Sequence, residues 1–298
     1  MKILITGSRG QLGTELCECF LRGFTELGVP DILKEKNEVT ALDIDTLDIS
    51  DYNAVKALFL AEKFGAVINC AAYTNVDGCE ENADAAFKAN ALGPRNLAMA
   101  SKLIGAKLVH ISTDYVFTGN GTRPYTEADL PAPVSAYGRT KMLGEEFVRE
   151  FSTKHFIVRT AWLYGYCGKN FVKTMINAGK KFGKLTVVSD QRGNPTNCAD
   201  LAHHILKLLT TEEYGVYHGT GRGECSWYDF AAEIIRLSGV DATVSPCTTE
   251  EYARNNPKSA NRPAYSSLDN MMFRCTVGDE FRDWKDALSS FMKNYKEA

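Results

Sequence analysis

The chain has 298 residues, enough for one large domain or for a domain with a smaller companion. It is 44% apolar and 24% charged with a formal net charge of −3, so its composition gives no reason to expect binding to nucleic acid or to an anionic membrane. Nine cysteines form no Cys-x-x-Cys pair, no apolar stretch reaches the roughly 18–20 residues that span a bilayer, and an apolar strand pattern from residue 2 leaves no room for a signal peptide. We therefore expect a cytoplasmic protein with reduced thiols.

Strand and helix patterns alternate along the first 160 residues. An apolar run at 2–6 that ends in glycine predicts a buried parallel strand, and the spacing of Leu12, Leu16 and Phe20 predicts a helix over 11–27. Further strands are predicted at 39–42, 66–70, 106–112 and 156–160, and further helices at 51–63, 83–104 and 134–151. This alternation predicts a Rossmann-type α/β fold, a doubly wound and mostly parallel sheet, over residues 1–160.

The pattern is less regular beyond residue 160. Helices are predicted at 170–182, 199–209, 227–238 and 281–295, and strands at 185–188 and 216–218. Residues 240–275 are rich in Pro, Asn, Ser and Thr, which indicates loops and short strands that cover a site. We expect residues 161–298 to form mainly a smaller substrate-binding region, with some segments returning to the Rossmann core.

A glycine-rich loop follows the first predicted strand and precedes the first helix. Its sequence, Gly-Ser-Arg-Gly-Gln-Leu-Gly at 7–13, has the spacing G-x-x-G-x-x-G. Glycines permit a tight turn and a close approach of the backbone to a pyrophosphate, which the helix N-terminus then faces. The loop predicts a dinucleotide site to which these residues contribute: Gly7, Arg9, Gly10, Gln11, Leu12 and Gly13.

The ends of the next two strands extend this site. Asp43 ends the second strand, where a carboxylate binds ribose hydroxyls and repels a 2′-phosphate, so it favours NADH. Arg9 favours NADPH instead, because a guanidinium pairs with a 2′-phosphate, and Asp43 could equally be a plain surface aspartate. The other candidates for cofactor binding are Asp48 and Ile49 near the adenine and the small-residue segment Ala71, Ala72 and Tyr73.

Tyr137 and Lys141 lie four residues apart in a predicted helix and therefore share one face. An ammonium group beside a phenol favours phenolate, so we expect Lys141 to lower the pKa of Tyr137 toward neutrality. Ser112 and Thr113 end the preceding strand and offer a hydroxyl that holds a substrate oxygen. Together these groups are suited to acid–base chemistry at a carbonyl during hydride transfer. Asp114 is followed by Tyr115 where a sugar dehydratase commonly has an Asp-Glu pair, which disfavours elimination.

In these motifs the chain resembles the extended short-chain dehydrogenase/reductase family, and within it the dTDP-4-dehydrorhamnose reductases. The resemblance covers nearly the whole length. It depends on Gly-Gln-Leu-Gly at 10–13, Ala-Ala-Tyr-Thr-Asn-Val-Asp at 71–77, Ser-Thr-Asp-Tyr-Val-Phe at 112–117, Tyr-Gly-Arg-Thr-Lys at 137–141 and Asp-Gln-Arg-Gly-Asn-Pro-Thr at 190–196.

The resemblance implies that Thr113 hydrogen-bonds the substrate carbonyl, that Tyr137 protonates it, and that Lys141 holds the nicotinamide ribose of NADPH or NADH. Ser112 is the alternative hydroxyl. The substrate-binding residues that it implies are Val76, Asp77, Thr113, Asp114, Tyr115, Trp162, Asn170, Gln191 and Arg262, with Asn194 a further candidate. Arg262 also has a physical reason, since a guanidinium suits a diphosphate, although it could be a surface arginine.

The implied activity is reduction of the 4-keto group of dTDP-4-dehydro-β-L-rhamnose by NAD(P)H. Two alternatives stay open: a non-catalytic NADP-binding subunit like the regulatory subunit of methionine adenosyltransferase, and a related nucleotide-sugar reductase or epimerase. We expect a monomer or homodimer whose partner is a small nucleotide sugar. Some members of the family use Mg²⁺ at a dimer contact, but the sequence has no acidic cluster to assign to a metal.

Overall fold

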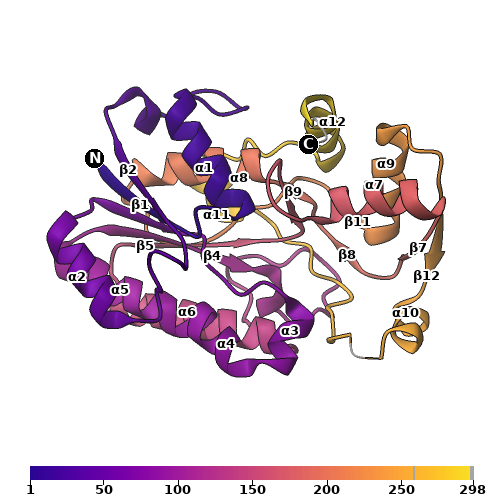
Figure 1. Ribbon diagram of the computed structural model, residues 1–298, viewed down its shortest axis with the longest axis horizontal. Helices are drawn as coiled ribbons and strands as arrows, with labels where there is room; N and C mark the ends of the chain where they lie inside the picture. Colours follow the sequence, from indigo (N-terminus) through magenta and orange to yellow (C-terminus); the bar gives the residue numbers. More distant parts are fainter. Residues whose placement is uncertain (258, 296–298) are drawn as a thin grey trace.

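Six parallel strands form the central sheet in the computed structural model, which describes residues 1–257 and 259–295 (Figure 1). Their order across the sheet is β10-β5-β4-β3-β1-β2. The strands are β1 (Lys2–Thr6), β2 (Glu38–Leu42), β3 (Ala66–Asn69), β4 (Lys107–Thr113), β5 (His155–Thr160) and β10 (Gly215–His218). The predicted parallel α/β sheet is thereby confirmed, and the strand order reverses between β1 and β3, the point at which such sheets bind nucleotides.

Helices cover both faces of this sheet, as Figure 1 shows. One face carries α2 (Tyr52–Glu62), α5 (Gly93–Ile104) and α6 (Ala136–Phe151), and the other carries α1 (Gln11–Arg22), α8 (Cys198–Leu209) and α11 (Met271–Cys275). Side chains alternate along each strand, so Ile3 and Ile5 pack with α1 and α8, whereas Leu4 packs with α2 and α5. Burial on both faces explains why these strands read as continuous apolar runs.

Two predicted helices differ from the structure. The helix predicted over 11–27 ends at Arg22, because Gly23 adopts a left-handed conformation with φ of 79° and closes the helix. The helix predicted over 83–104 consists of α4 (Ala83–Phe87), a π-helical turn at Lys88–Leu92 and α5. Pro94 lies in the first turn of α5, where the missing N–H costs little.

The C-terminal part forms a smaller lobe beside the sheet (Figure 1). It contains α7 (Phe171–Phe182), α9 (Trp227–Ser238), α10 (Thr249–Asn255), α12 (Trp284–Asn294) and the parallel pair β7 (Lys184–Val188) and β12 (Thr243–Cys247). Two pairs of two-residue strands form separate small sheets: β6 (Leu163–Tyr164) pairs with β9 (Thr196–Asn197), and β8 (Arg192–Gly193) with β11 (Cys225–Ser226). The N-terminal half of the chain has three further short elements, α3 (Val76–Glu81) and the 3₁₀ turns η1 (Asp31–Lys34) and η3 (Asp114–Val116). Three elements from beyond residue 160, α8, β10 and α11, belong to the body.

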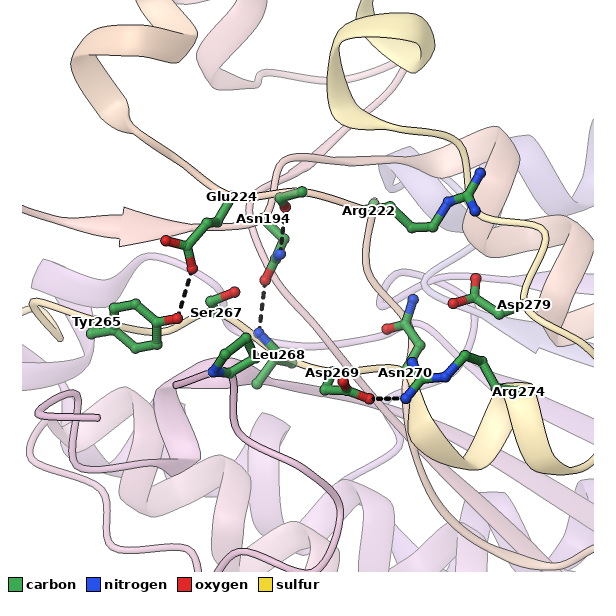
Figure 2. Close-up of a pocket in the computed structure, with 13 residues that line it drawn as sticks. Asn194, Arg222, Glu224, Tyr265, Ser267, Leu268, Asp269, Asn270, Arg274 and Asp279 are labelled. Atoms are coloured by element: carbon green, nitrogen blue, oxygen red, sulfur yellow. Dashed lines mark hydrogen bonds and ion pairs between the residues drawn. The ribbon is translucent and has the colours of Figure 1, made fainter. Parts of the chain in front are cut away.

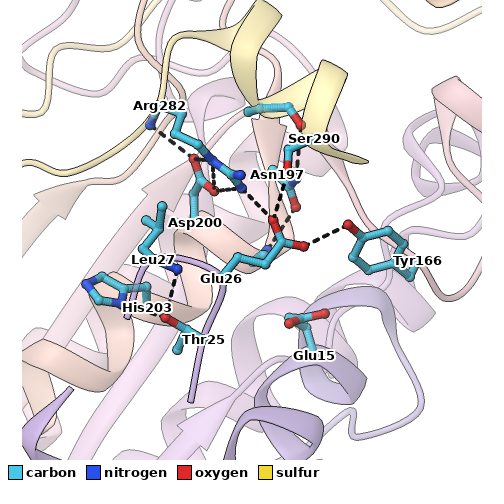
Figure 3. Close-up of polar contacts among 12 residues, drawn as sticks. Glu15, Thr25, Glu26, Leu27, Tyr166, Asn197, Asp200, His203, Arg282 and Ser290 are labelled. Atoms are coloured by element: carbon cyan, nitrogen blue, oxygen red, sulfur yellow. Dashed lines mark hydrogen bonds and ion pairs between the residues drawn. The ribbon is translucent and has the colours of Figure 1, made fainter. Parts of the chain in front are cut away.

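An ion network joins the loop after α1 to the C-terminal segment (Figure 3). Arg282 pairs with the buried Asp200 on α8 and, at 2.9 Å, with Glu26. Glu26 also accepts hydrogen bonds from the Tyr166 hydroxyl at 2.7 Å and from Ser290 on α12 at 3.3 Å. The carboxylates are therefore satisfied, and three chain segments distant in sequence are held together.

Among the residues that the structure describes, none of the helices combines the length and the apolar character needed to cross a bilayer.

Candidate active site

The glycine loop lies between β1 and α1 in tight contact with the strand beside it. Gly7 has φ of 64°, and a Cβ there would come within 2.6 Å of the backbone nitrogen of Ala71. A Cβ on Gly13 would meet the carbonyl oxygen of Gly7 at 2.2 Å. The N-cap of α1 is Gly10 and has no side-chain hydrogen bond, so the first N–H groups of the helix remain available to an anion.

A cavity of about 490 Å³ extends from this loop along the ends of β2 and β3. It is lined by the predicted residues Gly7, Gly10, Asp43, Asp48, Ile49, Ala71, Ala72 and Tyr73, together with Ile44, Leu47 and Lys88. The backbone here is fixed by asparagines that the sequence reading missed. Asn69 accepts a hydrogen bond from the Ala71 amide, and Asn90 from the Tyr73 amide. An elongated groove of this kind fits the adenosine half of a dinucleotide.

A second cavity of about 520 Å³ shares Gly10, Cys70 and Ala72 with the first. It is lined by the predicted residues Gly10, Gln11, Leu12, Gly13, Ala72, Val76, Thr113, Asp114, Tyr115, Tyr137, Lys141 and Trp162. The strand end of β4, the first turn of α6 and the glycine loop therefore present their polar groups to one space. We call it the central cavity.

Tyr137 is brought into the central cavity by the first turn of α6, whose N-cap is Ser135. Its ring packs edge-on against Tyr115 with the centroids 5.5 Å apart. Burial raises the pKa of Tyr137, while a hydrogen bond with Thr113 lowers it and the nearby Asp114 raises it further. Without a cofactor the phenol is thus held neutral.

Lys141 lies one turn along α6 and is 2% exposed. Its ammonium group donates to the carbonyl oxygen of Ile111 at 2.6 Å. Burial lowers the pKa of Lys141 to about 8, and the opposing charge of Glu145 raises it in part. The expectation that Lys141 lowers the pKa of Tyr137 is wrong for this structure, because burial of the phenol dominates and the ammonium is directed at a backbone carbonyl.

The two candidate hydroxyls at the end of β4 have different surroundings. Both residues line the central cavity, where Thr113 Oγ1 donates to Asp114 Oδ1 at 2.9 Å and forms a hydrogen bond with Tyr137. Ser112 Oγ instead donates to the fully buried Glu145 at 2.5 Å. Burial raises the pKa of Asp114 to about 6, against hydrogen bonds from Ser266 and Thr113 that lower it. The Thr113 hydroxyl is therefore the better placed of the two to meet a substrate oxygen.

Two tryptophans form one wall of the central cavity. Trp162 stacks on Trp227 with ring centroids 3.5 Å apart and planes 8° from parallel. Trp162 has a φ of 47°, a conformation uncommon for a bulky residue, and Gly193 leaves room for its indole. The sequence reading found Trp162 but missed Trp227, for which the only signal was its place at the start of a predicted helix.

A third cavity of about 450 Å³ adjoins the central cavity, and Trp227 lines both. It lies in the C-terminal lobe and contains the predicted Gln191 and Arg262 as well as Phe171, Thr249 and Tyr252. Arg262 forms an ion pair with the predicted Asp77 of α3 through two hydrogen bonds of 3.0 and 3.1 Å. Gln191 donates to Thr249 at 3.0 Å. The three cavities form a continuous series from the end of β2 to the C-terminal lobe.

Four predicted residues line none of these three cavities, and one of them, Asp77, reaches the third cavity only through its ion pair with Arg262. Asn170 caps α7 by accepting from the Lys173 amide, and its amide nitrogen donates to Gln11 at 3.0 Å, so it braces the glycine loop. Arg9 lies at the rim and pairs with Asp45. Asn194 lines a separate cavity of about 810 Å³, shown in Figure 2, where it bonds Gly223 and the Leu268 amide.

Among the residues that the structure describes, no three His, Cys, Asp or Glu side chains lie close enough together to hold a metal ion. His203 bonds Thr25 and Glu280, and His204 bonds the Asp200 carbonyl.

Comparison with known proteins places these features in a family. The model of the RmlD substrate binding domain matches residues 1–297. The chain is 41% identical to the spore coat polysaccharide biosynthesis protein SpsK of Bacillus subtilis, over 100% of this chain and 99% of that protein. A crystal structure of a dTDP-4-dehydrorhamnose reductase from Clostridium acetobutylicum is 50% identical with a TM-score of 0.91, covering 98% and 99% of the two chains. The dTDP-4-dehydrorhamnose reductase of Bacillus anthracis in complex with NADP is 42% identical with a TM-score of 0.90, covering 98% of each chain.

Proposed function

Because the chain belongs to the RmlD substrate binding domain family, we propose that it is a dTDP-4-dehydrorhamnose reductase. It reduces the 4-keto group of dTDP-4-dehydro-β-L-rhamnose to give dTDP-β-L-rhamnose, with NADPH or NADH as the reductant. The observation that carries the proposal is the convergence of Thr113, Tyr137 and Lys141 with the glycine loop in the central cavity.

The nicotinamide, when bound, supplies the hydride that reduces C4 of the sugar. Tyr137 gives its phenolic proton to the oxygen that becomes the C4 hydroxyl, and its raised pKa keeps that proton available. Thr113 holds the same oxygen by a hydrogen bond. Lys141 binds the nicotinamide ribose, and its positive charge favours the phenolate that forms when the proton leaves.

The three cavities support one placement of the cofactor and of the nucleotide-sugar substrate. The cavity along β2 and β3 would take the adenosine half of the cofactor, and the central cavity the nicotinamide and the sugar, with Val76, Asp114, Tyr115 and Trp162 around it. The third cavity would take the nucleotide half of the substrate, where Gln191 and Arg262 lie beside aromatic side chains. Arg262 would bind the diphosphate, sharing or exchanging its pairing with Asp77.

The test is an assay with purified protein, dTDP-4-dehydro-β-L-rhamnose and each reduced cofactor. We expect one equivalent of cofactor oxidised per equivalent of dTDP-β-L-rhamnose formed. Flat absorbance with both cofactors would refute the proposal. A related epimerase would retain its dinucleotide through purification and turn over without net oxidation, and a non-catalytic binding subunit has no observation in its favour, since it needs no complete Thr-Tyr-Lys set.

We further propose that the protein works in the cytoplasm on this small-molecule substrate, as a monomer or homodimer. Its composition and modest net charge support a role without nucleic acid or membrane. Light scattering on the purified chain distinguishes the two assembly states.

A further inference from the structure

Three charged side chains meet where the glycine loop passes the end of β2. The Asp43 carboxylate accepts the Arg9 amide at 3.0 Å and the Ile44 amide at 2.9 Å, so each of its oxygens is held by the backbone. Partial burial raises the pKa of Asp43, but these amide donors outweigh it and the pKa ends below its ordinary value. Asp43 is thus a fixed, ionised acceptor at the cavity that would receive the adenosine ribose.

Arg9 is directed at a different carboxylate. Its guanidinium lies 2.5 Å from Asp45 and 3.8 Å from Asp43. Arg9 is the side chain of this loop with the chemistry to bind a 2′-phosphate, since a guanidinium matches phosphate oxygens. In the structure that capacity is taken up by Asp45. The group as a whole carries two carboxylates against one guanidinium, so a phosphate arriving here meets an excess of negative charge.

We propose that Asp45 sets the coenzyme preference of this chain toward NADH. By holding Arg9, Asp45 withholds the guanidinium from the 2′-phosphate of NADPH and leaves Asp43 to accept the ribose hydroxyls of NADH. This inference depends on the proposed function, which requires a nicotinamide cofactor but does not choose between the two. The Bacillus anthracis relative was crystallised with NADP, so the inference concerns relative affinity rather than exclusion.

Direct binding tests the inference without the sugar substrate. Dissociation constants for NADH and NADPH are measured by nicotinamide fluorescence on the full chain and on Asp45→Asn, Arg9→Ala and the double variant. Because Arg9 and Asp45 are both exposed, their pairing is weak, and we expect Asp45→Asn to tighten NADPH binding by about five- to tenfold and to change NADH binding by less than about twofold. The double variant of Arg9→Ala and Asp45→Asn should not bind NADPH more tightly, because the guanidinium that binds the phosphate is gone.

Two further variants act as controls. Asp31→Asn removes an aspartate from a similar exposed ion pair with Lys34, away from the cavity, and should change neither affinity. Lys88→Ala tests the lysine that lines the cavity itself, whereas Arg9 lies at its rim. The inference is overturned if the unmodified chain binds NADPH at least as tightly as NADH, if Asp45→Asn shifts both cofactors equally or neither, or if the gain depends on Lys88 instead of Arg9. Failure of the unmodified chain to bind either cofactor would refute the proposed reductase as well.

Discussion

In the proposed reaction Tyr137 acts as a neutral phenol, because carbonyl reduction needs a proton donor and burial keeps the phenolic proton in place. Two charged neighbours act on it differently. The Asp114 carboxylate disfavours phenolate, whereas the Lys141 ammonium can favour it only after turning from the Ile111 carbonyl. In the proposed complex the nicotinamide ribose would offer Lys141 such an alternative partner, and we expect the phenol to be more acidic there than in this structure.

Substitutions at the end of β4 should separate the two hydroxyls. Thr113→Ala removes the hydroxyl in the central cavity, and we expect kcat to fall by about 10²-fold or more, as for loss of one donor to a developing oxyanion. Ser112→Ala removes a hydrogen bond to the buried Glu145, so we expect a lower free energy of unfolding, by about 1–3 kcal/mol, with kcat largely retained. Steady-state kinetics and urea unfolding on both variants provide the measurements. The opposite pattern would make Ser112 the substrate-binding hydroxyl.

The protonation state of Lys141 predicts how kcat/KM for NADH depends on pH. Burial lowers its pKa to about 8, so the ammonium is present below that pH and is lost above it. Since the ammonium is proposed to bind the cofactor ribose, kcat/KM for NADH should be level below about pH 8 and fall by about tenfold per pH unit well above it. Lys141→Met should have low kcat/KM without this falling limb. A wild-type profile that stays level to pH 10 would contradict the assignment.

At the scale of elements, α6 is anchored to the sheet by a buried ion pair. Arg159 on β5 is 2% exposed and donates twice to Glu145 on α6, which is 0% exposed, at 2.9 and 2.7 Å. The same helix carries Tyr137 and Lys141, so this pair fixes the height of the catalytic side chains against β4. Ser112 donates to the same carboxylate, and Arg149 donates to it at 3.4 Å.

Breaking this pair should destabilise the fold. Arg159→Met removes both of its short hydrogen bonds to the buried Glu145 and leaves that carboxylate the partly exposed Arg149 at 3.4 Å as its charged partner, and we expect the free energy of unfolding to fall by about 3–5 kcal/mol. The double variant with Glu145→Gln should recover part of that loss, because it removes a buried charge that Arg149 compensates only in part. Urea unfolding of the three proteins measures both effects. A loss below about 1 kcal/mol for Arg159→Met would show that the pair does not anchor α6.

Periodicity predicted the elements of the body but not all of their ends. Buried strands and one-sided helices have distinct repeats, and Tyr137 and Lys141 share a face of α6 because of helix geometry alone. The end of α1 depends on the left-handed conformation of Gly23, and the π-helical turn at Lys88–Leu92 depends on packing against α6. Gly144 shows this packing, since a Cβ there would lie 2.1 Å from the Asn90 carbonyl oxygen. Contacts between elements set these features, and a single sequence does not reveal them.

At the scale of the whole molecule, the C-terminal lobe completes the series of cavities. Trp227 joins the central cavity to the third cavity, and Arg262 reaches across to Asp77 on the body. The sequence predicted that residues 240–275 cover a site. Loops have no periodic apolar pattern, however, so the sequence does not indicate which of their side chains contact one another. The pairing of Arg262 with Asp77 and the place of Trp227 therefore required the structure.

Removal of the Arg262 guanidinium should weaken the binding of the substrate and leave the binding of the cofactor unchanged. We expect Arg262→Ala to raise KM for the dTDP sugar by about tenfold or more, as for loss of a charge-assisted hydrogen bond, with KM for NADH nearly unchanged. Arg254→Ala, which breaks an exposed ion pair with Glu250 in the same lobe, is the matched control. Equal effects of Arg262→Ala on both KM values would place Arg262 outside the diphosphate site.

The transfer of deuterium from NADH labelled with deuterium at both C4 positions tests the central claim most directly. Turnover of dTDP-4-dehydro-β-L-rhamnose by the unmodified chain should place the label at C4 of dTDP-β-L-rhamnose, as read by mass spectrometry and NMR. Tyr137→Phe should still bind NADH while transferring the label about 10²–10⁴-fold more slowly, because the proton donor is gone. Product without deuterium at C4, or undiminished transfer by Tyr137→Phe, would contradict the account.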